Sequence, residues 1–345
     1  MEIQRCILCN LYGRKLYTID TEKQYWKSDV KGVFEYFVCQ KCGLIWLGNV
    51  PDNLHELYEK TSQMGTHVGL KNIEYDAIEK SGFKKKIKFF ILEDYGYKIN
   101  SKKIGFFEKF ISKLLSSFHF FKFIVGRDIM FLREEEKGKI LDVGCGNGNF
   151  LYLMKRLGWD TFGVETDKVA AQIAAQHGLN VFCGDIYQAN FPDNYFDAVT
   201  MNHVIEHVVD PKKVLLECSR ILKKGGKIAI ATPNIRSFFA QFYKQNYISF
   251  WPPYHIFHFS PNNLKKLVES VGYRILMLET FWLDPFLTNS KLCYFANKKG
   301  FGSIINRICY PSIYRAFPDW MMLKMLSLNG LFKFGNEIFI MAQKL

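Results

Sequence analysis

The chain has 345 residues, 48% of them hydrophobic, enough to bury a sizeable core in one large domain or in two to three units. Its formal net charge is +13, and no run of about 18 apolar residues lacks a charge, which argues against a membrane-spanning helix. The N-terminus shows no basic segment followed by an apolar one, and the nine cysteines are an odd number. We therefore expect a cytoplasmic chain without a disulfide framework.

Two cysteine pairs mark the N-terminal segment, residues 1–75. Cys6, Cys9, Cys39 and Cys42 occur as CILC and CQKC, with the C-x2-C…C-x2-C spacing of a zinc ribbon. Two thiolates from each short loop can reach one tetrahedral ion, and closed four-sulfur coordination is structural. We predict a zinc-ribbon unit that needs its metal to fold, with four reduced core cysteines as the alternative.

Residues 76–135 form a connector rich in lysine and aromatic residues. Residues 80–122 hold eleven lysines and three acidic residues, and a second basic segment covers 291–333. Apolar side chains at steps of three and four predict a basic amphipathic helix over 104–125. Three interpretations stay open: a helix packed on a sheet, a surface for a membrane or a lipid-linked or anionic substrate, and nucleic-acid binding.

From residue 136 to 345, short β-rich runs alternate with helical stretches, as in a doubly wound parallel sheet. The predicted strands are KILDVG, DTFGVE, NVFCGD, FDAVTMN, KIAIATPN, RILMLETF and EIFIMAQKL. SPNNLKKLVESVGY predicts a helix that starts at Ser-Pro and ends at a glycine. The expected fold class is α/β, a Rossmann-like sheet with a small N-terminal ribbon and a helical insertion, 285–333, before the last strand.

A glycine-rich turn, D142-V-G144-C-G146-N-G148, links the first strand of this sheet to a helix. Glycines let the backbone approach a ligand, and the helix N-terminus offers free N–H groups. A dinucleotide fingerprint would need a third glycine where Asn149 stands, and a Walker loop would need Gly-Lys-Ser/Thr.

The turn resembles the first motif of the class I S-adenosylmethionine (SAM) dependent methyltransferases, and further motifs follow in the expected order. Glu165 ends the second strand and Asp185 ends the third. MNHVIEHV then leaves the fourth strand and LKKGG leads into the fifth. The resemblance implies that Asp142 lies near the ammonium group of SAM, Glu165 near the ribose and Asp185 near the adenine. The SAM-binding residues implied are Asp142, Gly144, Cys145, Gly146, Gly148, Glu165, Thr166, Asp185, Ile186, Asn202 and His203. The structural alternatives are a helix-capping Asp142 and a loop acid at Asp185.

A zinc ribbon ahead of a SAM domain is similar to the zinc-binding methyltransferases of sugar and surface-glycan pathways. P253-Y-H255-I-F-H258-F-S260 resembles the P-x-H-x-x-x-F-S element of that group. The chain lacks room for the further C-terminal domain of the sugar C-methyltransferases, which speaks against deoxysugar C-methylation.

H203-V-I-E206-H207 fits two metal patterns. The H-x-x-E-H pattern of one zinc protease class needs a helix in a different fold. The resemblance to the ubiquinone-type O-methyltransferases is closer, because their Glu-x-x-Glu-His can bind a divalent ion. Here His203 replaces the first glutamate, so a metal at this place stays an open question.

Methyl transfer from a sulfonium to a hydroxyl needs an aligned nucleophile and a base, and histidine suits neutral pH. The base candidates are His207 and His258 first, then His203 and His255, each with a structural role as the alternative. We predict a cytoplasmic SAM-dependent methyltransferase, with contact to a membrane surface as a further interpretation of its basic segments. The cofactors are SAM and a structural Zn²⁺.

The predicted acceptor is a hydroxyl of a glycan, of a lipid-linked compound or of another small molecule. The alternatives are an RNA-modifying methyltransferase, suggested by the ribbon and the basic segments, and a noncatalytic binding module with a vestigial SAM domain. The fourth strand's exit lacks a base-methylation signature, which disfavours the first, and the intact Glu165, Asp185 and glycine turn disfavour the second. Oligomeric state stays open.

Overall fold

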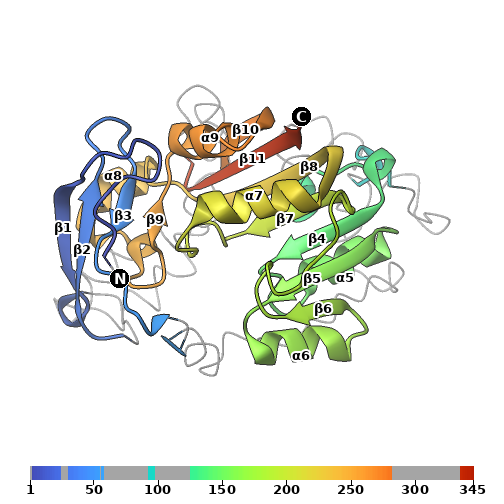
Figure 1. Cartoon of the computed structure of the whole chain (residues 1–345), viewed down its shortest axis with the longest axis horizontal. Coiled ribbons are helices and arrows are strands. Elements are labelled where there is room, and N and C mark those ends of the chain that lie inside the picture. The colour runs from blue at the N-terminus through green and yellow to red at the C-terminus, as the bar shows by residue number, and fades with distance from the viewer. Residues whose placement is uncertain (1, 25–29, 55, 58–91, 98–124, 282–334) are drawn as a thin grey trace, which may run out of the picture. The chain divides into compact units, whose positions relative to one another are not determined.

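The structure is a computed structural model (Figure 1) that describes residues 2–24, 30–54, 56–57, 92–97, 125–281 and 335–345. Nearly all of the predicted basic helix over 104–125 and all of the predicted insertion lie outside the described residues, as does the predicted boundary at residue 75. Among the helices that the structure describes, none has both the length and the apolar character needed to cross a membrane.

The larger sheet has seven strands. In spatial order they are β10 (Tyr273–Phe281), β11 (Glu337–Lys344), β8 (Leu222–Pro233), β7 (Phe196–Asn202), β4 (Lys139–Val143), β5 (Asp160–Glu165) and β6 (Asn180–Cys183). Strands β7, β4, β5 and β6 pair in parallel. β4 is the first of these strands in the sequence and lies between β7 and β5. The chain continues from it to β5 and β6 on one side and then to β7 and β8 on the other, which confirms the predicted α/β fold class.

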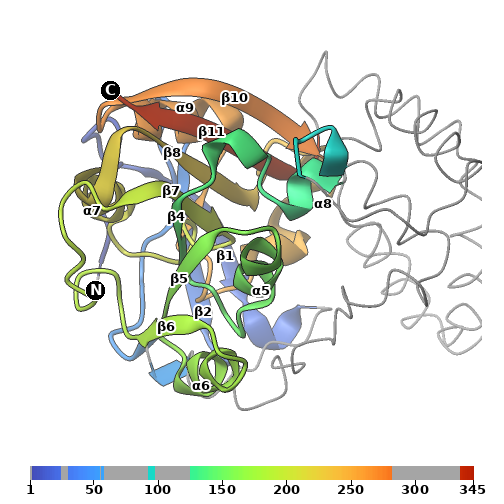
Figure 2. The ribbon, with the colours of Figure 1, turned by 90° about the vertical axis from the view of Figure 1, so that its right-hand side faces the viewer.

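The helices that accompany the strands are α5 (Asn149–Arg156), α6 (Lys168–Gln176), α7 (Pro211–Ile221), α8 (Phe238–Tyr243) and α9 (Pro261–Glu269). Helix α5 packs on β5, and α6 packs on β5 and β6, as Figure 2 shows. One predicted boundary shifts, because β8 begins at Leu222 and not after the glycine pair. Gly225 is accommodated within the strand at a φ of +77°.

Local capping explains where the helices begin. Asp167 caps α6 by accepting hydrogen bonds from the N–H groups of Val169 and Ala170. Ser260 caps α9 in a reciprocal capping box with Asn263, and Pro261 occupies the first turn, so the predicted Ser-Pro start is confirmed.

A second sheet of four strands combines distant segments. Its order is β1 (Arg14–Asp20), β2 (Val33–Val38), β3 (Ile45–Leu47) and β9 (Phe257–His258). Strand β9 pairs with β3 through Ile45 opposite His258. Tyr36 and Phe250 are fully buried and pack edge-on, with ring centroids 4.9 Å apart. The N-terminal strands therefore share a core with a segment more than two hundred residues later.

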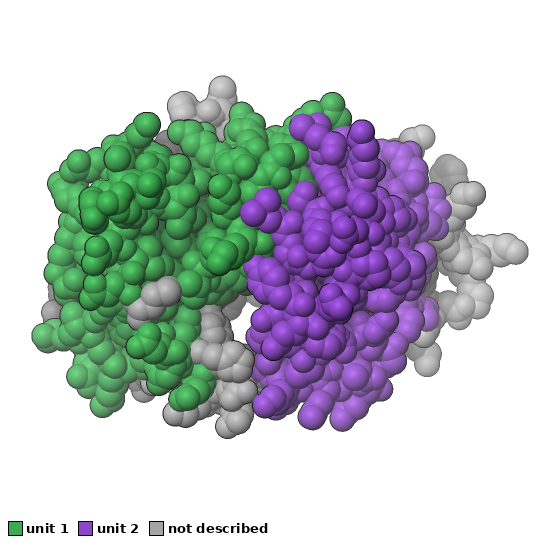
Figure 3. Space-filling model, in the orientation of Figure 1, with its two compact units in different colours: residues 1–58, 203–215, 230–342 green, residues 59–202, 216–229, 343–345 purple. Residues whose placement is uncertain are grey.

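The chain divides into two compact units (Figure 3). Unit 1 comprises residues 1–58, 203–215 and 230–342, and unit 2 comprises residues 59–202, 216–229 and 343–345. The sequence-predicted SAM residues from Asp142 to Asn202 belong to unit 2. The four paired cysteines and the candidate histidines belong to unit 1.

Candidate functional site

The turn between β4 and α5 is held open by its glycines. Gly144, Gly146 and Gly148 have φ values of +68°, +55° and +83°, a region that favours glycine. A Cβ on Gly148 would lie 2.4 Å from Leu179, whereas a Cβ on Gly146 would meet no atom of the described residues within 4 Å. Gly148 therefore serves packing, and the space above Gly146 is available to a ligand.

Cys145 was expected to help bind SAM, and its side chain faces the protein interior. It is buried in a cluster with Leu151, Ala174 and Leu179, and a Cβ on Gly163 would lie 2.6 Å from its sulfur. Any contact of Cys145 with a cofactor is therefore limited to its backbone.

Asp142 lies at the carboxyl end of β4 and is buried. The hydroxyl of Thr200, directly across the β4–β7 pairing, donates to its Oδ1 at 2.7 Å. Burial and, to a lesser degree, the nearby charge of Glu165 raise the pKa of Asp142 to about 7, although the Thr200 hydrogen bond acts to lower it. A buried carboxylate close to a second negative charge favours a cationic ligand.

Glu165 ends β5 and shapes the glycine turn. Its Oε2 accepts from the N–H of Gly146 at 2.7 Å, and its Oε1 accepts from the N–H of Asp167 at 2.9 Å. Each carboxylate oxygen has two lone-pair directions, so both oxygens can still accept from a bound ligand. Glu165 thus connects the turn to the second strand, at the place where the sequence predicted a ribose partner.

Asp185, Ile186 and Thr166 occupy the next loops. Oδ1 of the exposed Asp185 accepts from the N–H groups of Tyr187 and Gln188 at 2.9 and 2.8 Å. This is the loop-capping role that stood as the structural alternative, and the second carboxylate oxygen is not engaged in these bonds. Ile186 is buried and Thr166 is exposed.

Asn202 ends β7 and meets a residue that the sequence did not single out. Nη2 of Arg127 donates to its Oδ1 at 2.6 Å. Arg127 lies in the predicted connector, which contains many basic residues, so the sequence did not distinguish it from the others. Its contact with Asn202 becomes visible only in the folded structure. Thr200 was missed as well, although its position two residues before Asn202 on a predicted strand would have placed it beside Asp142.

His203 begins a second group of side chains, in unit 1. Its Nδ1 lies 3.2 Å from Oε1 of Glu206, and its Nε2 lies 2.8 Å from Oε1 of Glu337. Burial alone would lower the pKa of His203, but hydrogen bonds to these two carboxylates raise it to about 10. An imidazolium with both N–H groups donated has no lone pair for a proton, which argues against the predicted base role of His203.

His207 and His255 differ from His203 in their protonation state. Nδ1 of His207 lies 3.0 Å from the carbonyl oxygen of Tyr254, and Nδ1 of His255 lies 2.6 Å from that of Ser249. Because a carbonyl only accepts, both Nδ1 atoms carry the proton and both Nε2 atoms carry the lone pair. Burial lowers the pKa of His207, and burial with the neighbouring His207 charge lowers the pKa of His255 to about 3. Both rings are neutral near pH 7.

His258, one of the two first base candidates, is a core residue. Its ring packs against Phe250 and Tyr36 at centroid distances of 4.6 and 5.3 Å, and burial holds its pKa well below the usual value. The pairing of β9 with β3 draws this side chain into the four-stranded sheet. That placement argues against proton transfer by His258, and its spacing in the sequence contained no signal of the pairing.

Part of the chain is similar to known proteins. Residues 119–278 match the family model of a methyltransferase domain. Ubiquinone biosynthesis O-methyltransferase of Coxiella burnetii (strain Dugway 5J108-111) is 30% identical over 163 residues, a match that covers 43% of this chain and 69% of that protein. The chain belongs to the class I SAM-dependent methyltransferases.

A second relative and a solved structure match different shares of the chain. Ubiquinone biosynthesis O-methyltransferase of Alkalilimnicola ehrlichii is 36% identical over 106 residues, so the match spans 29% of this chain and only 43% of that protein. The crystal structure of a SAM-dependent methyltransferase from Archaeoglobus fulgidus aligns with a TM-score of 0.43 at 23% identity, covering 70% of this chain and all of that one.

The turn of this methyltransferase fits SAM. The open space above Gly146 leaves room for a ligand at the backbone, and Asp142 and Glu165 would supply negative charge for its ammonium and sulfonium groups. SAM supplies an activated methyl group when bound, and these residues would hold it.

The affinity of this methyltransferase for S-adenosylhomocysteine should rise with pH. A protonated Asp142 cannot pair with the ligand's ammonium group, so binding below pH 7 must first remove a proton. Between about pH 6 and pH 8 we expect about a tenfold gain in affinity, measured by calorimetric titration. Asp142→Asn should bind weakly with a flatter profile, and an unchanged slope in that variant would assign the titration to another group.

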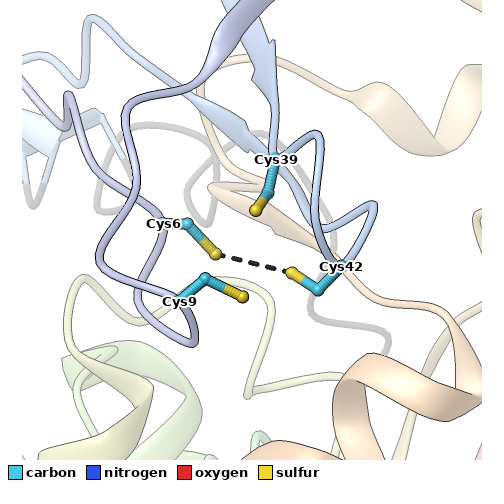
Figure 4. A group of neighbouring side chains, drawn as sticks. All are labelled: Cys6, Cys9, Cys39 and Cys42. Carbon is cyan, nitrogen blue, oxygen red and sulfur yellow. Dashed lines mark hydrogen bonds between the residues drawn. The ribbon is translucent and has the colours of Figure 1, made fainter.

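The four paired cysteines of the methyltransferase come together in unit 1 (Figure 4). Their sulfur atoms all lie within 4.8 Å of one another, with 3.6 Å between Cys6 and Cys42. A tetrahedral zinc with Zn–S bonds of about 2.3 Å needs sulfurs about 3.8 Å apart. The spacing fits such an ion and is far too long for a disulfide bond.

The two cysteine loops have the same backbone geometry. The N–H of Asn10 donates to the carbonyl of Cys6, and the N–H of Gly43 donates to that of Cys39, both at 2.8 Å. Asn10 and Gly43 both have positive φ, and each follows the first cysteine of its pair by four residues. Two matched loops that face one another are typical of a zinc ribbon.

Proposed function

We propose that the protein transfers the methyl group of SAM to a hydroxyl of a small-molecule, glycan or lipid-linked acceptor. The observation that carries this proposal is the β4–α5 turn, where the open backbone at Gly146 adjoins the carboxylates of Asp142 and Glu165. Two relatives are ubiquinone biosynthesis O-methyltransferases, which favours an oxygen as the acceptor atom.

The cofactor roles follow from charge and hydrogen-bonding capacity. Asp142 binds the ammonium group, Glu165 accepts from the two ribose hydroxyls and the free oxygen of Asp185 accepts from the adenine amino group. Asn202 and His203, at the end of β7, border the methyl group. Asn202 is held by Arg127, so its amide N–H groups face away from that bond and can donate to an acceptor.

The base is His207 or His255. Both are neutral near pH 7, and in both the Nδ1 hydrogen bond to a backbone carbonyl directs the lone pair to Nε2. A base of this kind contributes on the order of 10² to 10⁴ in rate by taking the hydroxyl proton as the oxygen attacks. His203 instead stays protonated and holds the two glutamates in place.

The cysteine cluster binds a structural Zn²⁺. Closed coordination by four sulfurs leaves no position for a substrate, so this ion stabilises unit 1 and takes no part in methyl transfer. The sulfur spacing and the two matched loops support the assignment.

Titration with S-adenosylhomocysteine tests the cofactor assignment. Glu165→Ala should weaken binding by about 10- to 100-fold, since charge-assisted hydrogen bonds to two hydroxyls are lost. Glu269→Ala is the control, because this glutamate forms a surface pair with Lys265, at 3.7 Å, and lies outside the glycine turn.

Tight binding in the wild type that is lost in Glu165→Ala would support the cofactor assignment. Candidate acceptors, beginning with glycans and lipids, would then be assayed for methyl transfer from SAM with a labelled methyl group. A folded, zinc-loaded protein that does not bind S-adenosylhomocysteine would refute the proposed activity and favour a noncatalytic binding module.

A further inference from the structure

We infer that Glu206, His207 and His255 form a second metal site, which binds a divalent transition ion of the Zn²⁺ class through one carboxylate oxygen and two imidazole nitrogens. One donor atom from each of the three residues lies within 4.8 Å of the other two. Bonds of about 2.1 Å to a tetrahedral ion need donors about 3.4 Å apart, so even the widest pair must close by at most about 1.4 Å.

The two histidines are oriented as metal ligands. Each donates its Nδ1–H to a backbone carbonyl, His207 to Tyr254 and His255 to Ser249, which fixes the tautomer and presents Nε2. Metal-binding histidines characteristically have such an outer hydrogen bond, because it holds the ring and raises its basicity. The ring centroids lie 4.6 Å apart, and Nε2 of His207 lies 4.0 Å from Oε1 of Glu206.

The backbone holds the two ligand segments together. The carbonyl oxygen of Glu206 accepts from the N–H groups of Ile256 and Phe257 at 2.8 and 3.1 Å. These bonds join the segment of Glu206 and His207 to the residues that directly follow His255. The site is therefore built by the fold before any ion binds, and loop movement is not required to assemble it.

The carboxylate of Glu206 is buried and fixed in place. Its side chain is 1% exposed, and Oε1 lies 3.2 Å from Nδ1 of His203. Oε2 of Glu206 accepts from the hydroxyl of Thr232 at 2.9 Å, so this carboxylate is held in one orientation. The Glu206 carboxylate is therefore buried and fixed 4.0 Å from Nε2 of His207, as a ligand oxygen of the same ion needs to be.

The ligand set differs from the Glu-x-x-Glu-His pattern that this stretch resembles. His203 stands at the first glutamate position, but its two nitrogens contact Glu206 and Glu337, so it positions a ligand and is not one. The third ligand comes instead from P253-Y-H255, nearly fifty residues later. With both Nε2 lone pairs bound to the ion, neither histidine can act as the base of the proposed function. A hydroxyl bound to such an ion loses its proton more readily, so, resting on the proposed methyl transfer, the ion would activate the acceptor in place of a histidine base.

Metal content tests the inference directly. The full chain is loaded with Zn²⁺, freed of loosely bound metal and measured by mass spectrometry. We expect two ions per chain in the wild type and one in His255→Gln and in His207→Gln, with both variants folded by circular dichroism. His177→Gln is the matched control, because this exposed histidine at the end of α6 belongs to unit 2, and it should keep two ions.

Co²⁺ substitution assigns the ion that is lost. The thiolate charge-transfer absorption of the four-cysteine site should persist in His255→Gln, while the weaker bands of a nitrogen and oxygen site disappear. One ion in the wild type, or two ions in both folded histidine variants, would overturn the inference. Because His255 is buried, Glu206→Gln provides a further variant that removes the ligand charge while keeping the side-chain shape.

The measurement of metal content and the measurement of S-adenosylhomocysteine binding can fail independently of each other. A protein that binds S-adenosylhomocysteine but holds one ion retains the proposed methyl transfer and loses the second metal. A protein that holds two ions but does not bind S-adenosylhomocysteine gives the opposite result.

Discussion

Gly146→Arg should weaken S-adenosylhomocysteine binding by at least about 100-fold, or about 2.7 kcal/mol, while the chain stays folded. A Cβ at this position meets no atom of the described residues within 4 Å, so the new side chain starts in open space. It would instead occupy the ligand's space and place a cation beside Asp142 and Glu165. Calorimetric titration gives the affinity, and thermal unfolding gives the stability.

Gly178→Arg separates the loss of ligand space from backbone strain. Gly178, after α6, has a φ of +69°, and a Cβ added there would likewise meet no atom within 4 Å. Both substitutions therefore carry the same left-handed strain, on the order of 1–2 kcal/mol. Equal melting temperatures with binding lost only in Gly146→Arg would support the cofactor placement. Retained affinity in Gly146→Arg would refute it.

The sheet and the turn could be predicted because their signals are local. The glycine spacing after a β-rich run predicted the β4–α5 turn, and Ser260 with Pro261 marked the start of α9 within one residue. Such signals depend on backbone conformation within a few residues. The same holds for the cysteine loops, where C-x2-C predicted which four sulfurs would meet.

The roles of the histidines could not be predicted, because they depend on distant partners. His203 owes its raised pKa to Glu206, three residues later, and to Glu337, 134 residues later, and no pattern in the sequence connects it to Glu337. His258 and His255 are only three residues apart, yet β9 carries one into the four-stranded sheet and leaves the other beside His207. A two-residue strand has too little sequence to reveal its pairing partner.

Cys39→Ser should release one metal ion per chain and destabilise unit 1 by at least about 3 kcal/mol, because metal binding is coupled to folding. Cys39 directly follows β2, and its N–H and carbonyl groups both bond within the second cysteine loop. Cys183→Ser is the control, because Cys183 is exposed at the end of β6 in unit 2. Metal analysis with chemical denaturation measures both effects, and an unchanged metal content would remove the ribbon assignment.

The loss of stability in Cys39→Ser should extend beyond the cysteine loops to the rest of unit 1. The side-chain amide of Asn263, in the first turn of α9, donates to the carbonyl of Cys42 at 2.8 Å, and β9 pairs with β3. Release of the ion therefore frees a hydrogen bond at the start of α9 and loosens the strand that contains His258. Hydrogen exchange in Cys39→Ser should rise over residues 257–269. Gly146→Arg should leave the same amides protected and the metal bound, since its turn lies in unit 2 and the cysteines lie in unit 1.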